Sequence, residues 1–277
     1  MLRKPTKQKL PRDKLLMQSS FSTLKLPQID LYELDGSKSG TGRWDSSQSQ
    51  LRQALEEFGC FEALHDKMTL KLHNDAFQEL EELLKLPNDV KCRFDFLDKL
   101  ETMNTYVTRV LELDSLVKKL VLGSLGVDKY LESLAKLVRY NFRLMRYAAP
   151  GTEESKKSRA WCHRDANFVI VLHQNHVNGL EVQTKDGCWF EVAPSSATSL
   201  TGWSNGRLHG DKHSPCHRVM MSGHEARYCI GLFSSVQGTI QCPDELVDDQ
   251  HPLLFKSFDV AGLSRIYKTK EGDGYLL

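Results

Sequence analysis

The pattern of apolar and polar positions divides the chain into two halves with different periodicity. In the first half, apolar residues recur at steps of three and four, which is the spacing of one face of a helix. This spacing predicts helices over residues 45–58, 69–86 and 100–125, with short strands over 24–31 and 60–64. Asp45 and Ser46 are expected to cap the first helix, because short polar side chains accept bonds from the first turn.

After about Arg139 the chain changes to short runs rich in Val, Ile, Phe and Tyr, which are separated by turn residues. Such runs are typical of antiparallel strands. Strands are predicted over 142–147, 168–173, 180–184, 188–192, 218–221 and 227–234. Asn178-Gly179 and Asp186-Gly187 indicate hairpins, because type I′ turns need positive φ at both central residues. We therefore expect an antiparallel sandwich or jelly roll with the helices packed outside it.

Composition narrows the function classes. The 277 residues carry 37 basic and 36 acidic side chains, a net charge of +1, which argues against a general nucleic-acid binder. No run of about 18 uncharged apolar residues indicates a membrane span. Seven scattered cysteines without a C-x-x-C pair favour a reducing compartment over a disulfide framework. We expect a cytoplasmic monomer that binds a small molecule, with no nucleic-acid or membrane partner.

The first 23 residues are basic and are expected to form a disordered tail, with an organelle transit peptide as the weaker alternative. Translation could begin at Met1 or at Met17.

Histidines concentrate in the second half, where eight of the ten follow residue 160. Residues i and i+2 of a strand share a face, so His163 and Asp165 can meet one ion. Two histidines and one carboxylate with open positions opposite suit a non-haem Fe(II) that also binds O₂ and a co-substrate. The second histidine is expected further along the chain. The candidates for it are His209, His213 and His217, of which His217 leads directly into a predicted strand.

Arg227 and Cys229 share one face of the last predicted strand, which is otherwise apolar. An arginine in such a setting is costly unless it pairs with an anion. A guanidinium–carboxylate pair is the favoured solution. The carboxylate could belong either to a ligand or to the protein itself.

Three motifs in order, His163-Arg164-Asp165, Ser214 to Val219 with His217 at its centre, and Arg227-Tyr228-Cys229, resemble a known signature. It is the H-x-D…H…R-x-S pattern of the plant Fe(II)/2-oxoglutarate-dependent dioxygenases. The chain is most similar to the branch that includes the glucosinolate alkenyl- and hydroxyalkyl-producing enzymes. The resemblance covers most of the chain from about residue 24 onward.

The resemblance implies a double-stranded β-helix, or jelly roll, as a single mainly β domain with flanking helices. Its expected parts are a tail over 1–23, a helical flanking region over 24–138, an oxygenase core over 139–258 and a C-terminal tail over 259–277.

The resemblance also implies a set of site residues. His163, Asp165 and His217 would hold Fe(II), and no further catalytic residue is implied. Arg227 and Cys229 would bind the co-substrate 2-oxoglutarate. Asn141 would lie near the co-substrate, although Phe142 stands where the family often has tyrosine. The implied reaction uses O₂ to hydroxylate or desaturate a small plant specialised metabolite while 2-oxoglutarate becomes succinate and CO₂.

The chain departs from the family pattern in three places. Cys229 replaces a serine, and a thiol is a weak hydrogen-bond donor, so we expect weaker 2-oxoglutarate binding. Residues 196–202 stand where the family has a strand, and 210–213 look inserted, which predicts a lost core strand and leaves His209 or His213 as substitutes for His217. Residues 92–96 run almost directly into the third helix, so part of the substrate pocket is expected to be missing.

These departures leave alternatives open. The chain could be a truncated, catalytically inactive member of the family that acts as a binding protein, or a decayed paralogue. A zinc hydrolase using the same three ligands is weaker, because it leaves Arg227 without a purpose.

Overall fold

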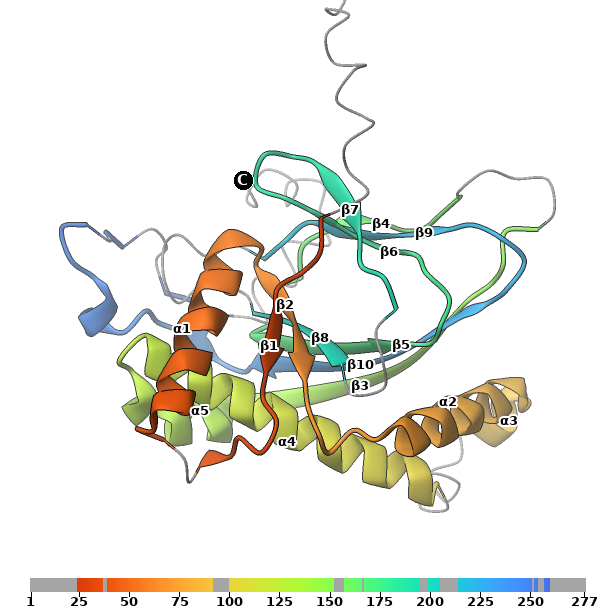
Figure 1. Ribbon diagram of the computed structural model, residues 1–277, viewed down its shortest axis with the longest axis horizontal. Coiled ribbons are helices and arrows are strands. Elements are labelled where there is room, and N and C mark those ends of the chain that lie inside the picture. Colours follow the sequence, from red (N-terminus) through yellow and green to blue (C-terminus); the bar gives the residue numbers. More distant parts are fainter. Residues whose placement is uncertain are drawn as a thin grey trace, which may run out of the picture.

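Two β-sheets face each other in the computed structural model, and helices cover the outer side of the larger sheet (Figure 1). The structure describes residues 24–36, 39–91, 100–151, 157–165, 167–194, 199–204, 214–250, 252–253 and 257–259. No helix among these residues is long and apolar enough to cross a membrane. The jelly-roll fold expected from the sequence is confirmed.

The three helices predicted from periodicity are present with ends close to the expected ones. They are α1 (Gly42–Glu57), α2 (Leu70–Lys85) and α4 (Glu101–Ser124). The N-cap of α1 is Thr41, whose Oγ1 accepts a bond from the backbone of Trp44 at 3.3 Å, so the helix begins before the predicted Asp45 or Ser46 caps. Shorter helices, which the pattern did not predict, are α3 (Asn88–Lys91) and α5 (Leu131–Leu137). Single 3₁₀ turns cover Asp128–Tyr130 and Asp244–Leu246.

The larger sheet has six strands, and helices α2 and α4 lie along its outer face (Figure 1). In spatial order the strands are β1 (Gln28–Asp30), β2 (Cys60–Leu64), β8 (Ser199–Ser204), β5 (Val169–Gln174), β10 (Arg227–Val236) and β3 (Val138–Tyr147). The predicted loss of a core strand is wrong, because β8 pairs with β2 on one side and with β5 on the other. Residues 199–204 therefore complete the larger sheet.

The smaller sheet has four strands and carries the H-x-D motif at its edge. Its order is β4 (Lys157–His163), β9 (His217–Met221), β6 (Leu180–Gln183) and β7 (Trp189–Glu191). A separate two-stranded ribbon pairs β11 (Thr239–Ile240) with β12 (Phe258–Asp259). Strand β4 was not among the predicted strands, since its sequence does not alternate regularly between apolar and polar residues.

The two predicted hairpins have different outcomes. Asp186-Gly187 joins the antiparallel neighbours β6 and β7, so this hairpin is confirmed, but Gly187 has a positive φ (89°) and Asp186 does not, so the turn is not the predicted type I′ turn. Asn178-Gly179 is not a hairpin turn, because the strands before and after it belong to different sheets. Gly179 instead lies against Arg227, where an added Cβ would come within 3.3 Å of the arginine Cδ. The glycine is therefore needed for close approach rather than for a hairpin.

Alternation along β10 decides which residues face the interior between the sheets. Phe233 packs in one apolar cluster with Val182 and Phe190 of the smaller sheet, whereas Ile230 and Leu232 pack with the helices. Since residues i and i+2 share a face, Arg227 and Cys229 face the interior together with Phe233. The helix side of the same sheet is closed by the larger apolar cluster.

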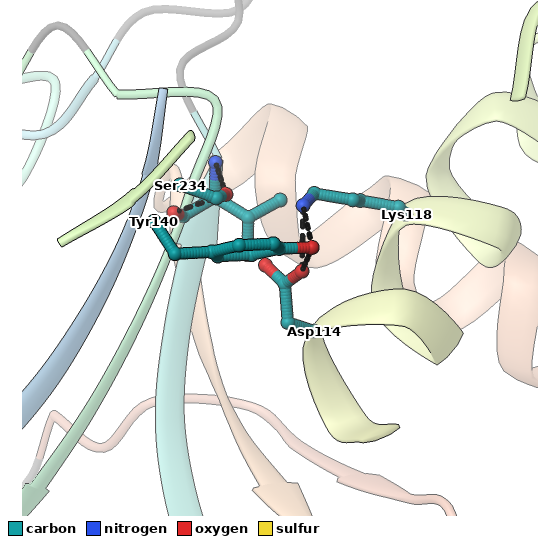
Figure 2. Close-up of polar contacts among 5 residues, drawn as sticks. Asp114, Lys118, Tyr140 and Ser234 are labelled. Atoms are coloured by element: carbon teal, nitrogen blue, oxygen red, sulfur yellow. Dashed lines mark hydrogen bonds and ion pairs between the residues drawn. The ribbon is translucent and has the colours of Figure 1, made fainter. Parts of the chain in front are cut away.

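A buried polar network fixes α4 across the larger sheet (Figure 2). Lys118 Nζ donates to Asp114 Oδ2 at 2.5 Å and to the Tyr140 hydroxyl at 3.2 Å, and that hydroxyl donates to the same carboxylate oxygen at 3.0 Å. In the neighbouring strands, Ser234 Oγ donates to the Val169 carbonyl at 2.8 Å. Through Tyr140 the buried ion pair connects α4 to β3.

Candidate metal centre

The pairing of β4 with β9 brings two histidines directly opposite each other. His163 and His217 are register partners, and their ring centroids lie 4.3 Å apart. Asp165 follows β4 by two residues and directs its carboxylate at both rings. Its Oδ1 lies 3.8 Å from His163 Nε2, and its Oδ2 lies 3.4 Å from His217 Nε2. The three side chains predicted as metal ligands are thus brought together.

Backbone carbonyls orient both imidazole rings. His163 Nδ1 lies 2.7 Å from the Trp161 carbonyl, and His217 Nδ1 lies 3.3 Å from the Pro215 carbonyl. A carbonyl oxygen only accepts, so each Nδ1 carries the proton and each Nε2 presents its lone pair toward Asp165. Metal-binding histidines are usually fixed in this way by a bond at the other ring nitrogen.

The donor set fits a divalent transition metal. One ligand atom from each of His163, Asp165 and His217 lies within 4.8 Å of the other two. For metal–ligand bonds of about 2.1 Å, neighbouring ligands of an octahedral ion are about 3.0 Å apart, so a small contraction of the observed spacing would seat an ion. Two imidazoles and one carboxylate on one side of an ion are the donors that non-haem Fe(II) takes in oxygenases.

Exposure increases across the three side chains. The His217 side chain is 7% exposed, that of Asp165 is 17% exposed and that of His163 is 50% exposed. Burial lowers the pKa of His217, His163 beside it acts in the same direction, and Asp165 opposes both. The imidazole is therefore kept neutral, which is the form that binds a metal. His217 also faces the interior, because it pairs with Val182 of the inner apolar cluster.

Arg227 lies in the interior on the opposite sheet and is only 1% exposed. Its Nε and Nη2 both donate to Gln174 Oε1, at 3.0 and 2.7 Å, and its guanidinium lies 5.1 Å from the centre of the Tyr147 ring. Within the described part of the chain, no carboxylate forms an ion pair with it. A buried cation whose partners are all neutral indicates a site for an anionic ligand.

Cys229 lies beside this arginine and is 1% exposed. Burial raises the pKa of its thiol, an effect that Arg227 opposes, so the sulfur remains a neutral thiol. Tyr147 is directly opposite Arg227 in the β3–β10 ladder. Sequence reasoning missed Tyr147. It lies six residues after Asn141 on the same strand, so period-two spacing from Asn141 could have placed it on the interior face.

Asn141 is not brought to Arg227, although the resemblance placed it near the co-substrate. It pairs with Phe233, six positions along β3 from Tyr147. At roughly 3.3 Å per residue this is about 20 Å. Tyr147 lies opposite Arg227 instead, and its hydroxyl donates to Met145 Sδ at 3.7 Å. The alternative ligands His209 and His213 lie outside the described residues, as do residues 92–99.

A disulfide links two cysteines that sequence reasoning did not pair. Cys162 and Cys216 are bonded, with their Cα atoms 6.1 Å apart. Among the other cysteines of the described residues, Cys60 and Cys229 are buried free thiols, and Cys188 and Cys242 are partly exposed ones. Among the described residues there is therefore one disulfide, beside the histidines, rather than a disulfide framework.

Comparison with known proteins agrees with the geometry. A family model described as the 2OG-Fe(II) oxygenase superfamily matches residues 137–236. The Arabidopsis thaliana protein "Probable 2-oxoglutarate-dependent dioxygenase AOP1" is 32% identical over 302 residues, which cover 90% of this chain and 99% of that protein. The Arabidopsis thaliana "2-oxoglutarate-dependent dioxygenase AOP2" is 24% identical, covering 90% of this chain and 95% of its own. The branch predicted from the motifs is confirmed.

The fold has a solved counterpart, the rice dioxygenase for auxin oxidation. Its crystal structure superposes with a TM-score of 0.74 at 23% identity, and the match covers 88% of this chain and 95% of that one. The alignment with AOP1 spans 302 positions, more than the 277 residues of this chain, so that relative contains segments which this chain lacks.

Proposed function

This chain belongs to the plant 2-oxoglutarate-dependent dioxygenases, enzymes that use Fe(II) and 2-oxoglutarate, and on that premise we propose its reaction. It hydroxylates or desaturates a small organic metabolite of plant specialised metabolism with O₂, while 2-oxoglutarate becomes succinate and CO₂. The single observation that carries this proposal is Arg227, a buried cation without a carboxylate partner among the described residues, which faces the sheet that holds the histidines and Asp165.

In this proposal His163, Asp165 and His217 hold the iron. Bound there, the iron supplies the activation of O₂ and of the co-substrate that no side chain of the protein supplies. The chain contributes the orientation of its ligands through the two Nδ1 bonds to backbone carbonyls. It also keeps His217 neutral, so that no proton competes with the metal for Nε2.

Arg227 binds the distal carboxylate of 2-oxoglutarate. Gln174 orients it, because one amide oxygen accepts from two guanidinium nitrogens while the Gln174 amide nitrogen donates to the Val192 carbonyl at 3.0 Å. Tyr147 directs its ring to the same guanidinium. The remaining N–H groups of the guanidinium can donate to the ligand. A charge-assisted pair with a carboxylate is stronger than a hydrogen bond between the same guanidinium and a water molecule.

We further propose a substrate that carries negative charge, because a second cation, the exposed Arg143, lies on the interior-facing side of β3. The guanidinium of Arg143 lies 4.3 Å from the centre of the Phe233 ring, which belongs to the same apolar cluster as Val182, the partner of His217. Replacing Arg143 with Met should raise KM for an acidic substrate about tenfold, whereas Arg146→Met, on the opposite face of β3, should not. Equal effects of the two changes would exclude this assignment.

The experiment that tests the proposed function uses anaerobically purified protein. Fe(II) and 2-oxoglutarate are added, the visible metal-to-ligand charge-transfer band is recorded, and succinate is measured after admission of air. A band with succinate release is expected, and His163→Ala should abolish both. A band without succinate, in the presence of a panel of candidate substrates, would favour the inactive binding protein. Neither signal, with a chain that unfolds without cooperativity, would favour decay.

Two observations support catalysis over the competing readings. Both sheets of the jelly roll are formed, and the larger one includes β8, the strand that was expected to be lost. The metal ligands and Arg227 occur together on facing sheets, whereas a zinc hydrolase has no use for a buried arginine. Both observations therefore support an active enzyme over an inactive or decayed relative.

A further inference from the structure

The disulfide between Cys162 and Cys216 lies directly beside the candidate metal ligands. Cys162 immediately precedes His163, and Cys216 immediately precedes His217. The two cysteines are 54 residues apart in sequence, yet the bond crosses between the same two strands that carry the histidines. Because each cysteine is the chain neighbour of one histidine, the disulfide restrains the distance between the two imidazole rings.

The two histidines differ in how firmly the fold holds them without this bond. His217 begins β9, which has neighbours on both sides, β4 and β6. His163 ends β4, an edge strand whose pairing with β9 is interrupted twice, between Ser158 and Ala160 and again between Ala160 and His163. Edge strands with irregular pairing are the least protected part of a sheet. One ligand is therefore fixed by the sheet, while His163 and the following Asp165 depend on an irregular edge.

The bond is open to chemical attack from one side. Cys162 is exposed, whereas Cys216 is only 7% exposed. Thiol–disulfide exchange needs access to a sulfur by the incoming thiolate, and Cys162 provides that access. The sequence predicts a reducing compartment, in which a permanent structural disulfide is uncommon. A bond in this position is thus suited to being made and broken.

We propose that Cys162 and Cys216 form a redox modification site that controls metal affinity. The disulfide holds His163 and Asp165 against His217 and favours metal binding, and the dithiol lets the edge strand move away and weakens it. This inference rests on the proposed function, because it assumes that His163, Asp165 and His217 bind iron. The effect expected is about tenfold in affinity, within the range of 10 to 100 found for groups that orient metal ligands.

The chemistry balances with peroxide as oxidant and a dithiol as reductant. In oxidation, one thiolate attacks hydrogen peroxide to give a sulfenic acid and hydroxide, and the second thiol displaces water from it, so two thiols and one peroxide give one disulfide and two waters. In reduction, a thiolate of the external dithiol attacks the Cys162 sulfur, and Cys216 leaves as a thiolate. The second thiol of the reductant then releases Cys162 and closes its own disulfide.

The test compares Mn(II) affinity in the two redox states of the metal-free protein. Mn(II) prefers nitrogen and oxygen donors over thiolates, so the freed cysteines do not bind it themselves. Protein is reduced with a phosphine and desalted without oxygen, or oxidised with one equivalent of hydrogen peroxide. The state of Cys162 and Cys216 is read by alkylation and mass spectrometry. Free Mn(II) is followed by electron paramagnetic resonance, which needs no turnover.

The oxidised protein should bind Mn(II) about tenfold more tightly than the reduced protein, and reoxidation should restore the affinity. Cys162→Ser should behave as the reduced form under both conditions, while Cys188→Ser, at a partly exposed free cysteine, should respond like the parent. If Cys162→Ser fails to fold, the comparison of the oxidised and reduced forms of the unsubstituted protein still tests the proposal.

Three results would overturn the proposal in different ways. Equal Mn(II) affinity in states verified as disulfide and dithiol would exclude redox control and leave the proposed function standing. Peroxide treatment that leaves both cysteines alkylatable would exclude the modification site itself. Absence of Mn(II) binding in both states would remove the proposed function, and this inference with it.

Discussion

Two histidine pairs in this molecule have nearly the same geometry and opposite chemical character. The rings of His163 and His217 have centroids 4.3 Å apart, and those of His73 and His173 have centroids 4.4 Å apart, with interplanar angles of 52° in both cases. The first pair bridges two strands of the smaller sheet. The second joins α2 to β5 on the helix side of the larger sheet, where His173 is 3% exposed.

The difference lies in what surrounds the ring nitrogens. Both nitrogens of His173 have protein partners, since Nε2 lies 2.9 Å from His73 Nδ1 and Nδ1 lies 2.7 Å from the Tyr106 hydroxyl. The first pair uses only Nδ1 for backbone contacts and turns Nε2 toward Asp165. Adjacent histidines therefore do not make a metal centre by themselves. The candidate metal centre differs from the second pair in three features, namely a nearby carboxylate, an Nδ1 bonded to the backbone on each ring, and one exposed side.

The largest expected effect separates the two pairs directly. His163→Ala removes one of three metal ligands, so metal affinity and succinate formation should fall by more than about 100-fold, beyond the loss seen when only a ligand's hydrogen-bond partner is removed. His73→Ala removes a histidine from the other pair and should change metal affinity less than about twofold, within the scatter for sites that share no partner. Calorimetric titration of Fe(II) under nitrogen measures both. A comparable loss in His73→Ala would end the distinction between the pairs.

The second test asks whether the interior opposite the metal ligands is a carboxylate site. Arg227→Met should raise KM for 2-oxoglutarate about 100-fold, because losing one partner of a buried charge pair costs 2 kcal/mol or more. Added 2-oxoglutarate should also no longer raise the Tm of the variant, because a ligand stabilises the folded protein only to the extent that it binds to it. Arg218→Met is the matched control, because Arg218 pairs with Glu181 at 2.7 Å and is not buried. Thermal stabilisation by 2-oxoglutarate in Arg227→Met would contradict the assignment.

The third test uses pH to confirm that the helix-side pair is held neutral. Burial, with a smaller effect from His73, lowers the pKa of His173 well below its ordinary value. The unfolded chain then binds a proton near pH 6.5 that the folded chain does not, so stability is lost as pH falls through and below that value. The slope should reach at most about 1.4 kcal/mol per pH unit for this proton.

Urea unfolding at pH 7.5, 6.5 and 5.5 with a chelator present measures that slope. His173→Gln keeps groups that can bond Tyr106 and His73 but does not titrate, so its stability should fall less steeply in acid than that of the parent. His176→Gln changes an exposed histidine that pairs with Glu225 and serves as the control. Identical slopes for the parent and His173→Gln would show that His173 is not the group responsible.

Sequence reasoning succeeded where a residue's neighbours along the chain decide its environment. The apolar spacing of α1, α2 and α4 predicted those helices, and period-two spacing placed Arg227 and Cys229 on one face. His163 and Asp165 were paired by the same rule. Such patterns reflect the face a residue presents, and faces are set by local backbone geometry.

It failed where the answer depends on which strand lies beside which. Asn178-Gly179 has the composition of a hairpin turn, but the chain crosses there from one sheet to the other. Asn141 and Tyr147 share a face of β3, and only the register with β10 shows which of them reaches Arg227. The bond between Cys162 and Cys216 likewise depends on β4 lying against β9. Strand order and register are tertiary properties, so local pattern leaves them open.

The smallest expected effect concerns the thiol beside Arg227. Cys229 is buried next to Arg227 and Gln174, where the family pattern has serine. A hydroxyl is a stronger hydrogen-bond donor than a thiol, so Cys229→Ser should lower KM for 2-oxoglutarate about threefold, which is about 0.7 kcal/mol and within the worth of one net hydrogen bond. Steady-state kinetics with varied 2-oxoglutarate measures the change.

Cys60→Ser is the matched control for this substitution. Cys60 is as fully buried as Cys229, and burial raises the pKa of both thiols, but Cys60 lies in β2 within the apolar cluster, where its thiol contacts the Phe58 carbonyl at 3.8 Å. A hydroxyl there has no ligand to bond, so the change should lower stability by about 1 kcal/mol or more and leave KM unchanged. If Cys229→Ser instead behaves like Cys60→Ser, losing stability without a gain in affinity, then residue 229 does not contact the co-substrate. Arg227 would in that case bind the carboxylate with only Gln174 and Tyr147 beside it.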